Sequence, residues 1–415
     1  MAASGTECVI HAGRLLADPA AGAEPRQSIR VVDGKVAEIS SGFIDPPEGA
    51  TLIDLRDKFV LPGLIDCHVH LTGQLGPGQR LGFVEDSDPR VGLDAAQRAR
   101  LTLAAGFTTV RDLGARKPEV IYALREAVAE GVVPGPRILC VGAILSPTGC
   151  HGQTYGFRQD VCACVQSSIG VCDGVDACRR AVRAQVAQGA DAIKFVATGG
   201  VLSNLRAGVD QQFTTDEIRT IIETAHQLGR RVSAHAHGLA GVNAALAGGV
   251  DSIEHGSFLD EGSIELFLKH GAFHVPTLIA GATVLGMARS GSVLTPAQAE
   301  KAIIVGERIK QALARTYKAG VPIAFGTDMG VGPHGQNARE FALMVEASMT
   351  PADAIKAATV TAARLLDISE IAGTLAPGKS ADIVAVGGDP LADITELERV
   401  SFVMARGKVA ALAGA

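Results

Sequence analysis

Eight short apolar runs alternate with helix-like stretches through the middle of the chain, and this alternation constrains the fold more than any other feature. Amphipathic segments such as 91–106 and 215–229 separate most of the runs. Strands that alternate with helices form parallel sheets, and eight such units over about 300 residues are typical of a (β/α)8 TIM barrel in the α/β class. The expected strands are 63–71, 107–114, 137–143, 191–200, 231–238, 251–257, 272–278 and 322–330.

Both ends of the chain have a different pattern, in which short strand-like runs are joined by tight turns. Asp33-Gly34 and Arg406-Gly407 are dipeptides that favour two-residue hairpin turns. Neither group has enough strands to form a stable sheet alone. We therefore predict one small β-sandwich domain built from residues 1–60 and 369–415, with the barrel at 61–368 between them.

Composition excludes several classes of protein. Of the 415 residues, 47 % are hydrophobic and 20 % charged, so the chain can bury a sizeable core. A net charge of −6, no Trp and 4 % aromatic residues argue against nucleic-acid binding. No apolar run is long enough to cross a membrane. The start of the sequence lacks a secretory signal, which favours a cytoplasmic location, or a periplasmic or secreted one if a signal peptide has been removed.

Five of the eight cysteines lie close together, and their spacing lacks the paired C-x2-C knuckles of a zinc ribbon. The spacing favours an insertion loop with reduced thiols over a disulfide in a secreted protein or a metal site. The five residues are Cys150, Cys162, Cys164, Cys172 and Cys178.

Five of the eight expected strands carry His, Lys or Asp at or near their C-terminal ends. Because these ends form the active-site face of a barrel, the side chains should converge. His68 and His70 are two residues apart on one strand, so they share a face and can bind one metal ion together. Cys67, between them, should face the helices. The spacing along the chain puts the remaining groups on strands 4, 5, 6 and 8: Lys194, His235 and His237, His255, and Asp328.

Lys194 is the most informative of these residues, since it lies in a strand that is apolar on both faces. Burying its charged amine is costly, and its pKa should fall. Two interpretations follow. Lys194 pairs with an acid such as Asp328, or its amine has reacted with CO2 to give an anionic carbamate that bridges two metal ions.

These strands carry the motifs PGLIDCHVH, AIKFVATGG, SAHAHG, SIEHG and FGTD, and GTLAPGKSADIVAVGGDPL follows the barrel. Together they resemble the amidohydrolase superfamily over almost the whole chain. The imidazolonepropionase-like branch is the most similar; it contains metal-dependent Xaa-Pro and Xaa-Arg dipeptidases and ochratoxin-degrading amidohydrolases. The resemblance implies a binuclear metal centre at the mouth of the barrel. It implies that His68, His70 and Asp328 hold the more buried metal ion, that carboxylated Lys194 bridges both ions, and that His235 and His255 hold the second.

The residue types fit this chemistry independently. Neutral imidazoles and carboxylates suit Zn²⁺, and two such ions sharing a hydroxide lower its pKa toward neutrality. We expect this bridging hydroxide to attack an amide between an acyl group and a C-terminal amino acid, as in a dipeptide, an N-acyl amino acid or ochratoxin A. Asp328 is the expected general base, which passes the hydroxide proton to the leaving amine. We take His235 as the strand-5 ligand and His237 as a hydrogen-bond donor to substrate.

The loops after strands 3, 4 and 5 offer partners for a substrate carboxylate, and we expect a small-molecule substrate and a homo-oligomeric enzyme. The candidate contacts are His151, Tyr155, Arg206 and His237. His274 is expected to be a core or rim histidine. The two glycines at 199–200 lack the G-x-G-x-x-G order, which argues against dinucleotide binding.

Two other functions are weighed against this hypothesis. A ring-opening cyclic amidohydrolase or an aminohydrolase such as a deaminase has the same fold. The metal sites of deaminases with this fold, however, resemble mononuclear sites and need no Lys on strand 4. A non-catalytic scaffold with a decayed site is disfavoured by the complete set of ligands. The number of metal ions per chain distinguishes these alternatives.

Overall fold

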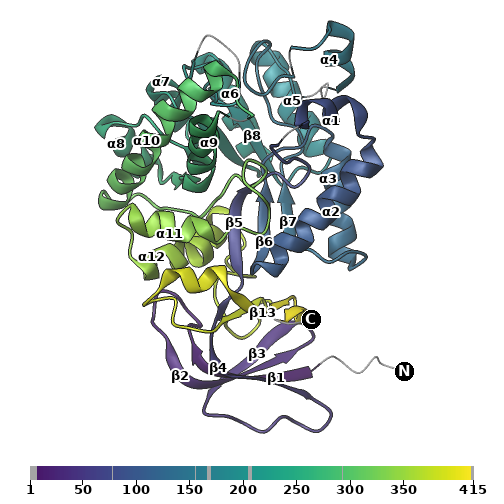
Figure 1. Ribbon diagram of the computed structural model, residues 1–415, viewed down its shortest axis with the longest axis vertical. Helices are drawn as coiled ribbons and strands as arrows, with labels where there is room; N and C mark the ends of the chain where they lie inside the picture. The colour runs from purple at the N-terminus through teal and green to yellow at the C-terminus, as the bar shows by residue number, and fades with distance from the viewer. Residues whose placement is uncertain are drawn as a thin grey trace.

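The computed structural model describes residues 7–76, 78–154, 156–165, 170–203, 208–291 and 293–412. Figure 1 shows a region built from both ends of the chain below a larger region of strands surrounded by helices. The strands are β1 Glu7–Leu15, β2 Glu24–Val32, β3 Lys35–Ser41, β4 Thr51–Pro62, β5 Leu64–Val69, β6 Phe107–Asp112, β7 Arg137–Cys140, β8 Ala192–Val196, β9 Arg231–Ala236, β10 Ser252–His255, β11 Phe273–Val275, β12 Ile383–Val386, β13 Val400–Ala405 and β14 Lys408–Leu412.

Most helices follow the barrel strands in sequence. They are α1 Gln79–Glu85, α2 Asp88–Ala104, α3 Pro118–Glu130, α4 Gln159–Val165, α5 Val175–Ala187, α6 Thr215–Gln227, α7 Leu239–Ala247, α8 Glu261–His270, α9 Leu278–Ser290, α10 Pro296–Lys318, α11 Arg339–Glu346, α12 Pro351–Lys356 and α13 Ala362–Leu365. A π-helical turn, Ala357–Thr361, joins α12 to α13, and a 3₁₀ turn, Ile394–Glu398, precedes β13.

Strands from both ends of the chain form one seven-stranded sheet, in the order β14-β13-β12-β4-β1-β2-β3. The ends meet where β12 pairs antiparallel with β4, for example Ile383 with Pro62. Both predicted hairpin turns are present, and Asp33 and Gly34 each have a positive φ, as a two-residue turn of type I′ requires. The predicted sandwich needs a second sheet. The described strands here form a single sheet, so the sandwich is not confirmed, and the domain limits at 60 and 369 stay a prediction.

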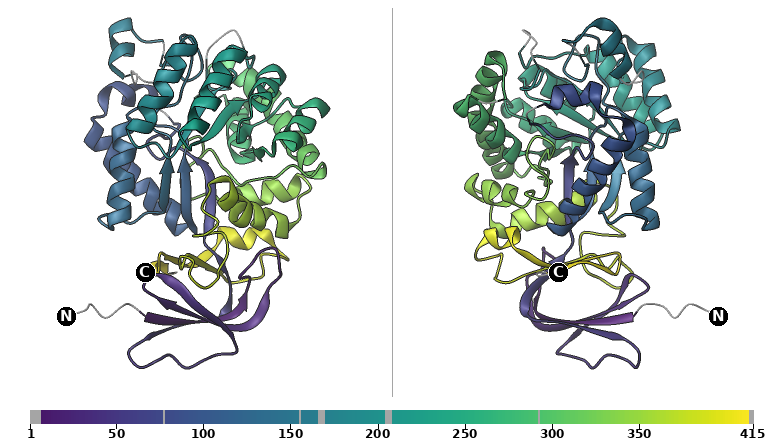
Figure 2. Two further views of the ribbon diagram at one scale, coloured as in Figure 1. Left: turned by 180° about the vertical axis from the view of Figure 1, so that it is seen from behind. Right: turned by 45° about the vertical axis from the view of Figure 1, so that its right-hand side comes forward.

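Seven of the eight predicted barrel strands are formed, in two parallel sheets. The orders are β5-β6-β7 and β8-β9-β10-β11, and helices surround both sheets (Figure 2). Within residues 293–412, the eighth predicted strand, 322–330, forms only isolated parallel bridges, between Ile323 and His274 and between Met329 and Val69. A third isolated bridge, Leu145 with Phe195, links the two sheets on the other side.

The closed barrel is therefore confirmed only in part: the strands follow the expected order, but no continuous ladder joins the two sheets among the described residues. A local conformation explains the interruption at the eighth position. Asp328 has a φ of 57° and Gly330 a φ of 117°, and neither value is compatible with an extended strand. The chain bends at Asp328, one of the predicted site residues.

The apolar residues pack as the alternation predicts. Helices α2 and α3 pack on β6 and β7, and α5, α6 and α7 pack on the sheet that starts with β8. Cys67 is fully buried in an apolar cluster that includes Ala362, Ala363 and Leu365 of α13, in agreement with its predicted orientation toward the helices. All eight cysteines lie in the described ranges, and all are free thiols. Within the same ranges, no helix has both the length and the apolar character needed to cross a membrane.

Candidate metal centre

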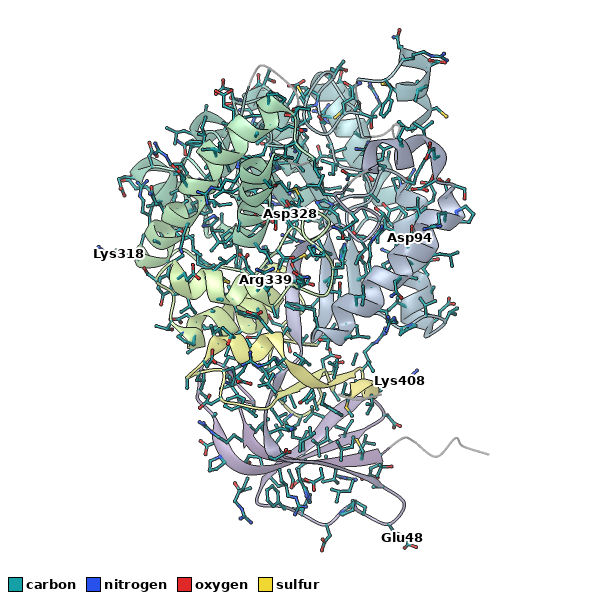
Figure 3. All side chains as sticks on the ribbon, viewed as in Figure 1. Glu48, Asp94, Lys318, Asp328, Arg339 and Lys408 are labelled. Carbon is teal, nitrogen blue, oxygen red and sulfur yellow. The ribbon has the colours of Figure 1, made fainter. Side chains whose placement is uncertain are left out.

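The first group of potential metal ligands consists of His68 and His70 at the end of β5 and Asp328 in the bent segment beside it. His68 Nε2 lies 3.4 Å and His70 Nε2 3.2 Å from Asp328 Oδ1. The three ligand atoms lie within 4.8 Å of one another, close enough to hold one ion. Figure 3 shows Asp328 among the barrel elements, far from Lys408 on the seven-stranded sheet that both ends of the chain form.

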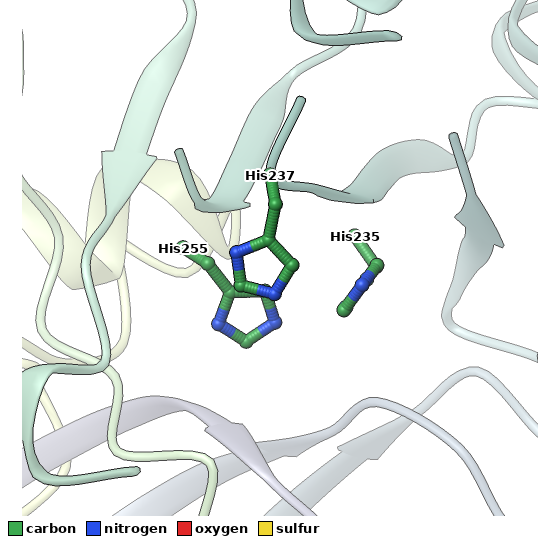
Figure 4. Close-up of side chains that lie close together, drawn as sticks. All are labelled: His235, His237 and His255. Atoms are coloured by element: carbon green, nitrogen blue, oxygen red, sulfur yellow. The ribbon is translucent and has the colours of Figure 1, made fainter. Parts of the chain in front are cut away.

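A second group lies beside the first and contains histidines only. His235, His237 and His255 also have ligand atoms within 4.8 Å of one another. The ring of His237 stacks on that of His255 with centroids 4.8 Å apart, and His235 faces the pair edge-on (Figure 4). The His68 and His255 rings are 5.3 Å apart, so the two groups adjoin. The sequence predicted that these side chains converge, and the described structure brings them together.

His68 is oriented by a buried network of charged and hydroxyl groups. Its Nδ1 lies 2.9 Å from Glu254 Oε2, and Arg111 Nη2 donates to Glu254 Oε1 at 3.0 Å. The hydroxyls of Ser233 and Ser252 donate to the same oxygen. Burial raises the pKa of Glu254, but Arg111, Lys194 and His68 together outweigh it and hold the pKa below its usual value, so the carboxylate is ionised. It accepts the Nδ1 proton of His68, which leaves the Nε2 lone pair directed toward Asp328.

His70 is held in the same way by a backbone group. Its Nδ1 lies 3.0 Å from the carbonyl oxygen of Gly114, which can only accept a hydrogen bond. The Nδ1 atom therefore carries the proton, and the Nε2 atom that faces Asp328 is free to bind a metal ion.

The histidines of the second group are supported by neutral partners. His255 Nδ1 lies 2.7 Å from Thr277 Oγ1, and His237 Nδ1 lies 2.8 Å from Ser257 Oγ. Burial and the neighbouring histidines lower the pKa of His255 well below its usual value. Burial, together with His151, lowers the pKa of His237 to about 3. The imidazoles are therefore neutral near pH 7, the state in which histidine binds metals.

Lys194 is the test of whether these residues fit a metal centre. Its Nζ atom is buried and has no hydrogen-bond partner among the described residues, and it forms no ion pair with Asp328 there. Burial lowers the pKa of Lys194 to about 8, so a fraction of the amine is unprotonated near neutral pH. Its charge also contributes to the low pKa values of His68 and His255, which places it within electrostatic reach of both groups. The orphaned amine and the two donor sets fit a metal centre.

Three residues at the strand ends around the site have left-handed backbone conformations. The φ angles are 73° for His255, 53° for Thr277 and 57° for Asp328. Such conformations are strained for residues with side chains and persist only where the surrounding structure fixes them. In β10 the turn at His255 interrupts the alternation of a strand, so that both Glu254 and His255 reach the site.

Asp328 is partly buried and ionised. Burial raises its pKa, whereas His68, His70 and Lys194 together lower it more, and the result lies below the usual value for an aspartate. An ionised carboxylate at this position can bind a cation and accept a proton.

The predicted substrate contacts are placed only in part. The His151 ring lies 4.5 Å from that of His235, and His237 belongs to the second group, so both lie at the site. Tyr155 and Arg206 lie outside the described residues. His274 is buried, with Nδ1 2.9 Å from Thr316 Oγ1 and Nε2 3.0 Å from the carbonyl of His255, as expected of a core histidine.

Glu254, Arg111 and Thr277 support the site but were not among the residues predicted from the sequence. A signal existed for two of them, since Glu254 and Arg111 are charged residues inside short buried strands and need a partner there. Thr277 follows a three-residue strand and carries no such signal.

Comparison with known proteins adds three relatives. Residues 59–410 match the amidohydrolase family. Ochratoxinase of Aspergillus niger is 33 % identical over 435 residues, covering 97 % of this chain and 86 % of the relative. The crystal structure of a Xaa-Pro dipeptidase with methionine bound in its active site is 37 % identical, with a TM-score of 0.91, covering 97 % of this chain and 99 % of that one. A prolidase in complex with N-methylphosphonate-L-proline is 31 % identical, with a TM-score of 0.88 and the same coverage.

Proposed function

Because the chain belongs to the amidohydrolase family, and is therefore a hydrolase of amide or peptide carbon–nitrogen bonds, we propose that it is a binuclear metal enzyme that releases a C-terminal amino acid from an acyl group. The substrates would be dipeptides or N-acyl amino acids, with ochratoxin A among the candidates. The names of the relatives, an ochratoxinase and a Xaa-Pro dipeptidase, support this substrate class.

One observation supports the binuclear centre above all: the two ligand groups adjoin, and a buried lysine amine within electrostatic reach of both has no partner in the described structure. His68, His70 and Asp328 would hold one ion, and His235 and His255 the other. Lys194, as a carbamate, would contribute an oxygen to each. A mononuclear site would leave one ligand group and the lysine without a role.

The metal ions, which we expect to be Zn²⁺, would supply Lewis acidity that activates water and polarises the scissile carbonyl. The residues of the chain do the rest. The Asp328 carboxylate takes the proton of the attacking water and delivers it to the leaving nitrogen, as its ionised state allows. The Nδ1 atom of His237 is hydrogen bonded to Ser257, which leaves Nε2 to bind the substrate.

Metal analysis combined with a substrate screen tests the proposal. Protein loaded with zinc should contain two ions per chain and hydrolyse N-acyl amino acids or dipeptides, with ochratoxin A included in the screen. One ion per chain with release of ammonia from an amino-substituted ring would show an aminohydrolase instead. Opening of cyclic amides, with no cleavage of linear ones, would show a ring-opening enzyme. Absence of metal and of turnover would indicate a scaffold.

A further inference from the structure

The consecutive glycines Gly199 and Gly200, after β8, leave room for groups from other loops. A Cβ atom on Gly200 would lie 2.3 Å from Nε2 of His151. One on Gly199 would lie 2.2 Å from the carbonyl oxygen of Gly208 and 3.3 Å from Nε2 of Gln212. The two shorter distances are far below a van der Waals contact, and the third is tight. Gly200 therefore admits the His151 ring to the wall of the site beside His235, and Gly199 admits the backbone of Gly208 with Gln212 beside it.

The two side chains carry polar atoms without partners. Gln212 Oε1 accepts a hydrogen bond from the backbone N–H of His151 at 3.0 Å, which fixes the amide orientation and makes Nε2 the free donor. Gln212 Nε2 and His151 Nδ1 are buried and have no hydrogen-bond partner among the residues that the structure describes. Such groups are costly to leave unpaired, so their presence at a site points to a ligand that supplies the acceptor.

Lys301 brings a positive charge to the same wall from a distant helix. Its Nζ donates to Gly200 O at 2.8 Å and to Ser203 Oγ at 3.2 Å, and also bonds the carbonyl of Ser203. One turn earlier on α10, Gln298 donates to Leu202 O. No described acidic side chain forms an ion pair with Lys301, whose pKa is lowered by burial alone. Its charge also contributes to the low pKa values of His151 and His237.

We propose that Lys301, Gln212 and His151 form an anion-recognition wall that binds the free carboxylate of the substrate. This inference rests on the proposed function, in which the leaving group is a C-terminal amino acid. Gln212 Nε2 and His151 supply hydrogen bonds to the carboxylate oxygens. The donors of Lys301 are occupied by the oxygens of residues 200 and 203, so Lys301 is a positioning residue: it fixes the Gly200–Ser203 turn, and its charge favours an anion beside it.

Kinetics on a pair of substrates, one with and one without a free carboxylate, measure this recognition of the carboxylate. We compare kcat/KM for an N-acyl amino acid that the enzyme hydrolyses and for its primary carboxamide. Lys301→Met and Gln212→Leu should each lower kcat/KM for the acid by about 10- to 100-fold and change the carboxamide less than about threefold. Lys301→Arg should restore part of the selectivity. Lys310→Met is the matched control, because Lys310 is exposed on the same helix and pairs with Glu346.

The selectivity ratio separates recognition from structural support. If Lys301 only stabilised the loop, Lys301→Met would reduce both substrates equally, and that result would overturn the proposal. Binding of an uncleaved N-acetyl amino acid and its carboxamide to the unmutated protein, measured by calorimetry, gives an independent readout. Equal affinities overturn the recognition wall even if hydrolysis is found. Hydrolysis of no acyl amino acid overturns the proposed function, while tighter binding of the acid, lost in Lys301→Met, would still support the wall.

Discussion

The two ligand groups differ in what lies behind them. His68, in the first group, rests on the buried ion pair of Glu254 and Arg111, and Asp328 adds a second carboxylate. The second group rests on the hydroxyls of Thr277 and Ser257 and contains no acidic residue. A cation at the first group therefore meets negative charge from the protein, whereas a cation at the second meets neutral donors only. In the proposed binuclear centre, a carbamate on Lys194 would bring to the second group the negative charge that its own residues lack.

The largest effect is expected at the first group. His68→Ala or His70→Ala should abolish turnover and remove at least one metal ion, because in the proposed centre these residues would supply two ligands to the same ion. Metal analysis and a hydrolysis assay check this. Full activity with normal metal content in either variant would falsify the site assignment.

Lys194→Ala tests the link between the groups. The variant should lose activity and the ion of the second group, since the second group retains no negative ligand. Short carboxylic acids such as formate or acetate should restore part of the activity by taking the place of the carbamate. An electron-density map of the metal-loaded protein that shows a bare amine at full occupancy would contradict the carbamate.

The supporting residues allow a direct comparison of the two groups. Glu254→Gln should weaken metal binding by about 100-fold and Thr277→Val by about 10-fold, the range expected for partners of metal ligands. Glu254→Gln also leaves Arg111 without its buried partner, which should cost about 3 to 5 kcal/mol of stability. Titration with a competing chelator gives the affinities. Similar losses in both variants would mean that the charge behind His68 does not distinguish the groups.

The smallest effect on metal content is expected at His237, and it decides whether His235 in β9 or His237 just after it binds metal. His237→Ala should keep both ions and reduce kcat/KM by about 30-fold, as for loss of one hydrogen bond to a charged substrate. His235→Ala should lose an ion. The reverse result, with metal lost only from the His237 variant, would exchange the two roles.

The sequence predicted which side chains converge better than it predicted the closure of the barrel. Strand ends of a parallel sheet meet at one face, so His68, His235 and His255 could be grouped from their positions alone. Glu254 was missed because strict alternation along a strand would put it on the face opposite to its neighbour His255. The positive φ at His255, which lets both side chains reach the site, is not visible in the sequence. Lys301 was missed because its helix follows β11 while its side chain contacts the loop after β8, a contact that no local pattern encodes.

The sequence also could not show how the eighth strand would pair. The run 322–330 has the composition of a strand, but its ladder is interrupted where Asp328 and Gly330 adopt positive φ angles. The backbone that would have completed the ladder instead presents Asp328 to His68 and His70. At this position the backbone adopts the conformation that places Asp328 in the site and gives up the extended conformation of a regular strand.

The pairing of β4 with β12 has a consequence for how the chain reaches its folded state. Pro62 pairs with Ile383, 321 positions later, so during synthesis one edge of β4 stays unpaired until nearly the whole chain has emerged from the ribosome. At about 5 to 20 residues per second, this interval lasts roughly 15 to 65 s. Contacts of such long range slow folding. Completion of the seven-stranded sheet must therefore be a late event in folding. A chain that ends before β12 would expose the open edge of β4 to pairing with other chains.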